Sequence, residues 1–483
     1  MTKFLRYITF IAIICIFSIF YSNRDVKGVE YSTMAMLVFN IFFSLQDPKR
    51  RFIFLAFQIT FAVFLLGQDI ASLLETRNGL FSRVIEEEFI NSTILHIYLT
   101  LFTSLIAVYL GYALNEQDYS ITKKNQVDLN NKYNIKLREY SKKFMNFFCI
   151  FAIAITIEKA IFVQATGYVE YYTSFHSILP SFFYRFETLY EISLFLYLAT
   201  LPRWKECRIA LLIYFVIGLV SLGYGQRNGF VLNTLFIAIY FSIRHLFKFY
   251  GKEEVWINKK RIVTIIIALP FLMYFLYTFG STRVDEKAKS FNNPIDNTLA
   301  FFHQQGGSIR LIGYEKELDD NNQFPKDAAP YTFGYLIDLY QQNAIFKAFK
   351  IYPSYAPLTV ERAMKGHNFG ETITYLYDHR YYFAGMGLGS CYIAEVHHDF
   401  GLIGVFLISF LYGLIFTLVY KYASRNPWSL FFGLTITMYI LYAPRSAALL
   451  FLNQILAPST IIFILFIVFL MKKYKNKSSK VAG

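Results

Sequence analysis

Runs of about twenty apolar residues recur along most of this 483-residue chain, and they constrain its fold more than any other feature. A helix needs about 20 apolar residues to cross the hydrocarbon core of a bilayer, so each run is long enough to be a membrane span. Apolar residues make up 55% of the chain and charged residues only 17%. The sequence therefore predicts an all-α membrane protein.

Windows of this length predict a polytopic bundle of about twelve transmembrane helices. Lys3 and Arg6 precede the first apolar run, as in a signal peptide, but no small-residue cleavage site follows it, so we interpret this run as a retained span. The predicted spans lie near residues 4–21, 30–45, 52–67, 93–114, 144–164, 181–200, 209–222, 230–243, 262–280, 401–420, 428–442 and 448–471.

The positions of Lys and Arg predict the orientation of these helices. Cytoplasmic loops near membrane spans carry an excess of both residues. Here the excess falls on the two ends of the chain and on alternate loops, which places both termini in the cytoplasm. The long polar segment from about Ser281 to Asp399 then lies outside. The net charge of +14 follows from this topology and from anionic lipid, so no nucleic-acid partner is expected.

These features divide the chain into three predicted parts. Residues 1–280 form an N-terminal membrane bundle of about nine spans, and residues 281–400 form one large α-rich extracytoplasmic loop domain. Residues 401–483 form about three further spans and a basic cytoplasmic tail. Within the loop domain, residues 331–350 carry an apolar stripe with the period of a helix.

Several common chemistries lack support in the sequence. The four cysteines are scattered, and there is no CxxC, HExxH or Walker motif and no glycine-rich dinucleotide fingerprint in the right context. No third and fourth metal ligand stands out at a matching spacing. We therefore expect neither a cofactor nor a metal.

Charged residues at the ends of apolar helices cluster on the predicted outer side. Such residues are costly in a membrane and tend to face a polar cavity, so each is a candidate functional residue. Arg227 and Arg445 lie in outer turns between short spans, where a guanidinium can form paired hydrogen bonds with phosphate oxygens. For each arginine the alternative is snorkelling to the headgroups or an ion pair with a carboxylate.

A second set of charged residues supports the same outer site. Arg310 and Arg380 in the long loop are further candidates for phosphate binding, with a salt-bridged or solvated role as the alternative. Arg185, Glu187 and Glu191 lie near the outer end of the sixth span, and the two carboxylates are four residues apart on one helical face.

The densest group of titratable residues ends the long outer segment. Glu395, His397 and His398 each offer a carboxylate or imidazole that can take a proton from an attacking hydroxyl. The alternative is a structural role at the start of the next helix, with Asp399 as the cap of a helix from Gly401 onward.

Layout and motif together resemble a known family. The residues that carry the resemblance are an outer turn, Gly225-Gln-Arg227-Asn-Gly229, and the closing pattern Gly387-x-Gly-Ser-x-Tyr-x-Ala-Glu395-x-x-x-Asp-Phe-Gly401-x-x-Gly404. With about twelve spans and a long outer loop in the second half, the chain resembles the Wzy-type polymerases of O-antigen and capsular oligosaccharides.

The resemblance implies a GT-C-like fold and a metal-independent membrane glycosyltransferase. Such an enzyme would act at the outer face of the bacterial inner membrane, with undecaprenyl-pyrophosphate-linked oligosaccharide as both donor and acceptor. Arginines in outer loops would hold the phosphates, which makes Arg227, Arg445, Arg380 and Arg310 the expected pyrophosphate ligands. Membrane lipid and a chain-length regulator are the further candidate partners.

Two other functions remain open. An O-antigen ligase-like glycosyltransferase would share this layout. A lipid-linked oligosaccharide flippase would also have about twelve spans and buried charges, but we expect such a transporter to have short loops and an internal repeat.

Overall fold

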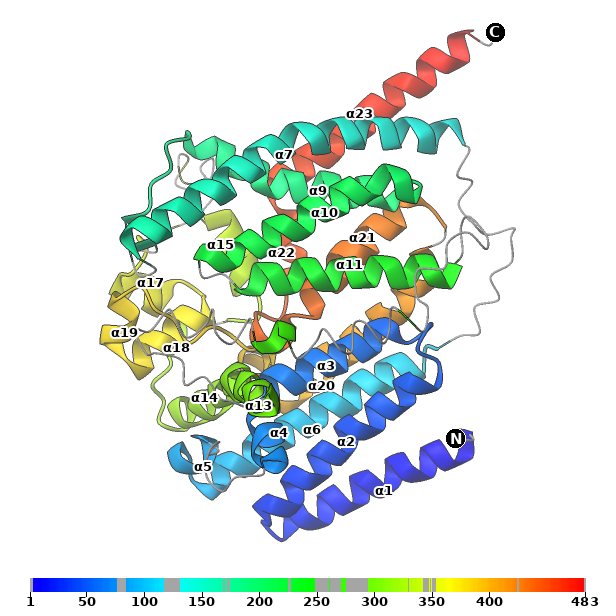
Figure 1. The fold of residues 1–483 in the computed structure, drawn as a ribbon. Coiled ribbons are helices and arrows are strands. Elements are labelled where there is room, and N and C mark those ends of the chain that lie inside the picture. The colour runs from blue at the N-terminus through cyan, green and yellow to red at the C-terminus, as the bar shows by residue number, and fades with distance from the viewer. Residues whose placement is uncertain are drawn as a thin grey trace. The chain divides into compact units, whose positions relative to one another are not determined.

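The computed structural model is helical throughout the part of the chain that it describes (Figure 1). This part comprises residues 3–75, 84–116, 131–167, 174–224, 227–247, 294–328, 330–341, 353–423 and 425–481, with a few isolated positions between them. No strand occurs among these residues, which confirms the prediction of an all-α fold.

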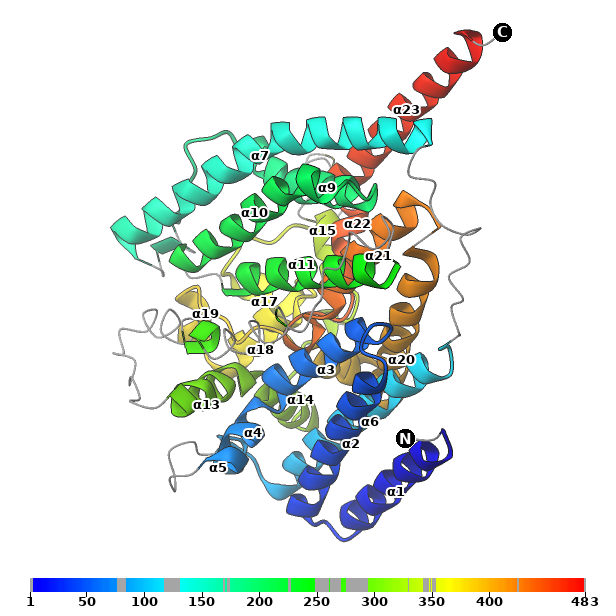
Figure 2. The same cartoon turned by 45° about the vertical axis from the view of Figure 1, so that its right-hand side comes forward.

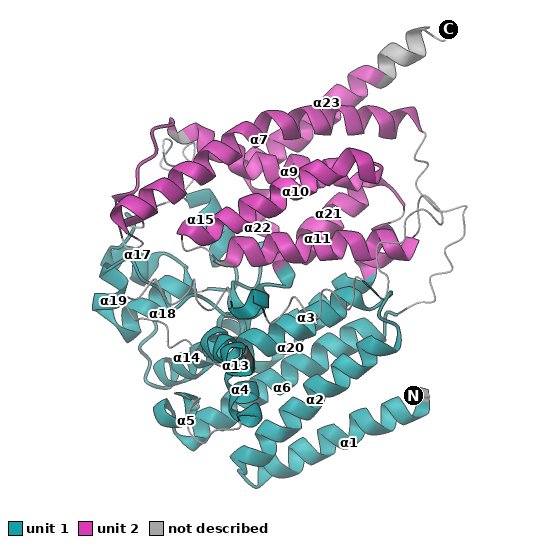
Figure 3. Ribbon diagram, viewed as in Figure 1, with its two compact units in different colours: residues 1–117, 259–417, 440–450 teal, residues 118–258, 418–439, 451–483 magenta. Residues whose placement is uncertain are grey.

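The chain divides into two compact units, each built from segments that are distant in sequence (Figure 3). Unit 1 contains residues 1–117, 259–417 and 440–450, and unit 2 contains residues 118–258, 418–439 and 451–483. The functional division into residues 1–280, 281–400 and 401–483 stays a prediction.

Unit 1 contains the N-terminal helices, most of the long polar segment and the first 26 residues of the helix that follows it. Its elements are α1 (Lys3–Ser22), α2 (Val26–Gln46), α3 (Phe52–Leu65), α4 (Gly67–Leu74), α5 (Val84–Glu88), α6 (Asn91–Ala113), α13 (Pro294–Gln305), η5 (Gly306–Ile309), α14 (Arg310–Asp320), η6 (Lys326–Ala328), α15 (Gly334–Gln341), α17 (Val360–Lys365), α18 (Phe369–Tyr377), α19 (His379–Phe383), α20 (Tyr392–Ala423) as far as residue 417, and η7 (Ala443–Arg445).

Unit 2 is held together largely by aromatic packing. Phe151 stacks on Phe183 with ring centroids 4.9 Å apart, and Phe195 stacks on Phe236 at 3.8 Å. Its elements are α7 (Lys132–Thr166), η2 (Ser181–Phe183), α9 (Tyr184–Ala199), α10 (Trp204–Ser221), η3 (Leu222–Tyr224), α11 (Arg227–Phe247), the end of α20, nearly all of α21 (Pro427–Ile440), α22 (Leu450–Leu456) after its first residue, and α23 (Pro458–Val481).

Fewer helices than expected are long and apolar enough to cross a membrane. In the described part of the chain seven helices meet this test, or up to nine if the bent pairs α3–α4 and α22–α23 each count as one span. The predicted spans 181–200 and 428–442 form α9 and α21, which have only 16 and 14 residues. Most of the predicted span 262–280 lies outside the described residues. The count of twelve spans is therefore not confirmed.

Within unit 1, helices α6 and α20 pack directly against each other (Figure 2). A Cβ added to Gly111 would lie 2.1 Å from the main-chain oxygen of Phe410, and one added to Gly413 would lie 2.2 Å from that of Val108. Small residues allow two membrane helices to approach this closely, where dispersion and weak polar contacts hold them. The two glycines therefore set the distance between α6 and α20.

Buried hydroxyl groups connect the same two helices, α6 and α20. Tyr392 at the start of α20 hydrogen-bonds Ser104 of α6, and its hydroxyl lies 3.3 Å from that of Ser409. Ser409 in turn donates to Ser104 at 3.1 Å, and all three side chains are buried. Because no water competes for these groups, the hydrogen bonds help to set the axial position of α20 on α6.

We expect Gly111→Ala and Gly413→Ala to lower the thermal stability of the purified protein in detergent. Even one added methyl would overlap a main-chain oxygen, and overpacking of this kind costs about 1–3 kcal/mol. The control is Gly433→Ala, because its Cβ would meet only side-chain atoms of Val419, at 3.2 Å or more. Equal melting temperatures for the three variants would contradict a direct backbone contact.

Candidate functional site

Glu395 lies in the first turn of α20, and it is 1% exposed. The Ser390 hydroxyl donates a hydrogen bond to one of its carboxylate oxygens. The Ala448 main-chain N–H donates to the other, at 2.8 Å. Both carboxylate oxygens of Glu395 therefore accept hydrogen bonds from groups of unit 1. This carboxylate connects the start of α20 to the segment that follows the turn η7.

Arg445 ends that turn and is half-buried. Its Nη1 donates to the main-chain oxygen of Gln305 at 3.2 Å, and its guanidinium carbon lies 5.6 Å from the centre of the Phe64 ring. No carboxylate is paired with Arg445 among the described residues. Its guanidinium thus keeps the capacity to bind an anion.

His397 faces a different part of unit 1. Its Nδ1 lies 3.0 Å and 3.1 Å from the two carboxylate oxygens of Glu315 on α14, and its ring lies edge-on to that of His96 on α6, with centroids 4.4 Å apart. Glu315 is fully buried, and burial raises the pKa of its carboxyl because desolvation disfavours the charged form. One ligand atom from each of the three residues lies within 4.8 Å of the others, so together they could hold a cation.

His398 has its own carboxylate neighbour. Its Nδ1 lies 3.4 Å from Asp319 on α14, and its ring packs against Phe324 and Tyr331 at centroid distances of 4.3 Å and 5.2 Å. Glu315, Asp319 and His398 also bring three ligand atoms within 4.8 Å of one another. At this distance Nδ1 forms no hydrogen bond with Asp319, so the carboxylate acts on the imidazole only through its charge.

Asp399 does not cap a helix beginning near Gly401. The helical segment that carries Asp399 begins at Tyr392 and breaks at Gly401, which has a φ of 61° and separates it from the helical segment that follows. The Asp399 carboxylate accepts hydrogen bonds from the main-chain N–H groups of Tyr331, at 3.1 Å, and Thr332, at 2.6 Å. The prediction was wrong because the N–H groups that Asp399 binds belong to a segment nearly seventy residues earlier in the chain, and not to the helix after Gly401.

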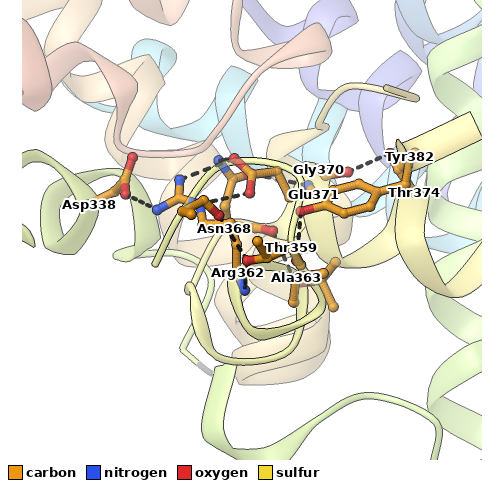
Figure 4. A network of polar contacts seen from close by, with 11 residues as sticks. Asp338, Thr359, Arg362, Ala363, Asn368, Gly370, Glu371, Thr374 and Tyr382 are labelled. Carbon is orange, nitrogen blue, oxygen red and sulfur yellow. Dashed lines mark hydrogen bonds and ion pairs between the residues drawn. The ribbon is translucent and has the colours of Figure 1, made fainter. Parts of the chain in front are cut away.

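Two arginines of the long segment are ion-paired. Arg362 on α17 is 6% exposed and points toward Asp338 and Glu371, forming two hydrogen bonds with Glu371 at 2.7 Å and 3.1 Å (Figure 4). Arg310 pairs with Glu88 through its Nε at 2.8 Å. These contacts confirm the alternative in which such arginines are salt-bridged.

The side chain of Arg380 on α19 is exposed and has no ion-pair partner among the described residues. Its main-chain N–H donates to Asp378, which caps α19. Of the arginines proposed for the long segment, Arg380 is therefore more accessible to an anion than Arg310.

The remaining predicted residues belong to unit 2. Arg227 begins α11, but its side chain lies outside the described residues, so its role in binding the pyrophosphate stays a prediction. Glu187 pairs with Lys159 at 2.8 Å, and Arg185 is exposed. Glu191 accepts hydrogen bonds from Tyr214 at 2.8 Å, Gln454 at 2.9 Å and Tyr439 at 3.1 Å.

Sequence reasoning missed the partners of the two histidines. His96 lies near the start of a predicted span, and an ionisable residue inside an apolar run is a signal that could have identified it. Glu315 and Asp319 carry no such signal, because acidic residues are common in a polar loop. Only the tertiary structure brings α6, α14 and α20 together.

Comparison with known families agrees with the motif at the start of α20. A family model described as O-antigen polysaccharide polymerase Wzy matches residues 5–478, which is nearly the whole chain. Searches of curated proteins and of solved structures find no match. The match confirms the resemblance seen in the sequence, and with the apolar helices it indicates a membrane-bound polymerase of O-antigen repeat units in the general sense. The chain therefore belongs to the O-antigen polysaccharide polymerase Wzy family.

Proposed function

We propose that this protein joins undecaprenyl-pyrophosphate-linked oligosaccharide repeat units at the outer face of the bacterial inner membrane. A hydroxyl of the acceptor unit attacks the anomeric carbon of the donor glycan. The bond from that carbon to the pyrophosphate oxygen breaks, and the lipid pyrophosphate leaves as an anion. The hydroxyl proton passes to a base on the protein. The family match supports the polymerase class, since it covers nearly the whole chain.

The observation that carries the site assignment is the hydrogen bond from the Ala448 N–H to Glu395. It connects the segment just after Arg445 to the helical turn that carries the titratable residues, within one compact unit. Glycosyl transfer needs positive charge at the departing phosphate and a base at the attacking hydroxyl, held in fixed geometry. This connection supplies a physical reason for the two to act together.

We assign phosphate binding first to Arg445, with Arg380 and Arg227 as further ligands. The guanidinium of Arg445 has no carboxylate partner in the described structure, whereas that of Arg310 is engaged by Glu88. Arg310 therefore fits a structural role better than a role in phosphate binding. Because guanidinium groups supply the positive charge, we propose that the transfer step is independent of metal.

We propose His398 as the general base. Its Nδ1 lies 3.4 Å from Asp319 and has no hydrogen-bond partner among the described residues, so the imidazole is available to accept a proton beside a carboxylate that favours its charged form. Glu395 has both oxygens bonded within the protein, so it is better suited to positioning the Arg445 turn than to taking a proton. His397 is occupied by Glu315, and Glu187, Glu191 and Arg185 are proposed as supporting residues of unit 2.

The proposed location follows from the charge distribution. Both termini would lie in the cytoplasm, and the long segment with its histidines and arginines would face outward. A chain-length regulator remains a predicted partner.

The surface glycan of a deletion strain tests the proposed function. Loss of a polymerase should leave single repeat units attached to the final acceptor, because units still reach the outer face but are not joined. Gel electrophoresis of the extracted glycan would show this pattern. Accumulated lipid-linked polymer would instead indicate a ligase, and units trapped on the inner leaflet would indicate a flippase.

Replacement of Arg445 by Lys tests phosphate binding. The charge is kept but the planar fork is lost, and we expect polymerisation to fall roughly 10- to 100-fold in the complemented deletion strain. The matched control is Arg425→Lys, an exposed arginine in a predicted inner loop, which should polymerise normally. Normal polymer length in the Arg445→Lys strain would exclude a bidentate phosphate contact there.

Replacement of His398 by Gln tests the base. We expect a loss of roughly 100-fold or more in the rate of polymer formation, with little change in binding of the lipid-linked donor, because general-base catalysis contributes on the order of 10²–10⁴-fold. Asp319→Asn should have a smaller effect of the same kind. A normal rate for His398→Gln, measured with purified protein and donor lipid, would transfer the role to Glu395 or His397.

A further inference from the structure

Three potential metal ligands from three helices meet in unit 1. They are His96 on α6, Glu315 on α14 and His397 on α20, and one ligand atom from each lies within 4.8 Å of the others. A tetrahedral Zn²⁺ with ligands at about 2.0–2.1 Å keeps them about 3.3 Å apart. His397 Nδ1 already lies 3.0 Å from Glu315, and one ligand atom of each residue lies within 4.8 Å of the others, so side-chain rotation that brings His96 closer would complete such a site.

A cation between these groups would match both their burial and their chemistry. Glu315 is fully buried, and the groups facing it are imidazoles rather than a lysine or an arginine. The Nε2 atom of His96 is buried as well and has no hydrogen-bond partner among the described residues. Two neutral imidazoles and one carboxylate around a divalent cation would satisfy all three groups at once.

The surroundings favour a cation for a second reason. The segment from Glu315 to Asp320 reads Glu-Lys-Glu-Leu-Asp-Asp, so it is acidic, and its one lysine, Lys316, is already paired with Asp320.

Packing holds Glu315 in place. Gly313, two residues before Glu315, lets α14 approach the ring of Phe89, since a Cβ there would lie 2.5 Å from a ring carbon. The carboxylate is thus held beside the start of α6 by packing.

We propose that His96, Glu315 and His397 bind one Zn²⁺ ion that links α6, α14 and α20. Imidazole nitrogens and a carboxylate oxygen are ligands that zinc accepts readily, and three protein ligands leave one position for water. The ion stabilises the contact between the membrane helices and the polar segment of unit 1.

This zinc site lies on the side of α20 away from Glu395 and next to the proposed base, because Glu315 also has a ligand atom within 4.8 Å of Asp319 and His398. His397 follows Glu395 by two residues, which is about 200° around a helix, so the two side chains leave α20 on nearly opposite faces. Glu395 bonds Ala448, near Arg445, whereas His397 contacts Glu315. The ion therefore lies away from the Arg445 turn, where it would hold three helices together with water as its fourth ligand, and its presence is measured independently of the proposed function.

Metal analysis of the purified full-length protein tests the proposal. The protein would carry a tag without histidine, be dialysed against chelator, reloaded with Zn²⁺ and measured by mass spectrometry. We expect close to one zinc per chain in the wild type and loss of most of it in His96→Gln, Glu315→Gln and His397→Gln. Two controls should retain zinc: His379→Gln, at an exposed histidine on α19, and His398→Gln.

The second group of possible ligands, Glu315, Asp319 and His398, gives an outcome that would overturn the proposal. If zinc instead uses Glu315, Asp319 and His398, then His398→Gln loses the metal and His96→Gln retains it. A wild-type protein that retains no zinc after reloading would overturn the proposal as well.

His96→Cys separates loss of a ligand from misfolding. A thiolate can replace the imidazole, so this variant should keep the metal. Loaded with Co²⁺, it should show a sulfur-to-cobalt charge-transfer absorption that wild-type protein lacks. A folded His96→Cys variant without this band would place His96 outside the coordination sphere. Because metal content is measured apart from glycan synthesis, failure here leaves the polymerase proposal untouched.

Discussion

The direct contact between α6 and α20 is the constraint on which the rest of unit 1 depends. Gly111 and Gly413 lie where each backbone meets the other, and Tyr392, Ser104 and Ser409 form a buried hydroxyl cluster at the same interface. In a membrane, where apolar burial does not drive helices together, close packing and such polar contacts determine which helices associate. Every titratable residue at the start of α20 inherits its position from this contact.

The first turns of α20 then distribute their side chains to separate partners. Glu395 contacts the segment after Arg445, His397 contacts Glu315, and Asp399 holds the main chain before α15. One helical segment thus organises three parts of the chain that are far apart in sequence. This arrangement explains why four of the five residues 395–399 are polar although the residues just before them, 391–394, are fully buried.

Hydropathy in the sequence was enough to predict most of the long helices, including α1, α2, α6 and α20, because an apolar run has few alternatives in a bilayer. It also predicted the helices α9 and α21, but these have only 16 and 14 residues, so their length does not confirm them as membrane spans. The role of Asp399 and the ligands around His397 depended on tertiary contacts with residues 315–332, whose sequence gives no periodic signal. Local pattern predicted where polar residues gather, but not which partners they have.

Glu395 and Glu315 are two buried carboxylates of unit 1, and their different partners explain why we propose a metal at only one of them. Glu395 is satisfied by a hydroxyl and a main-chain N–H, both neutral donors directed at separate oxygens. Glu315 instead faces imidazole nitrogens, which serve as donors only when they carry a proton and as metal ligands when they do not. With both histidines charged, His96 and His397 would repel each other across 4.4 Å between ring centres. A shared divalent ion removes that repulsion and neutralises the carboxylate, because both imidazoles then bind in their neutral form.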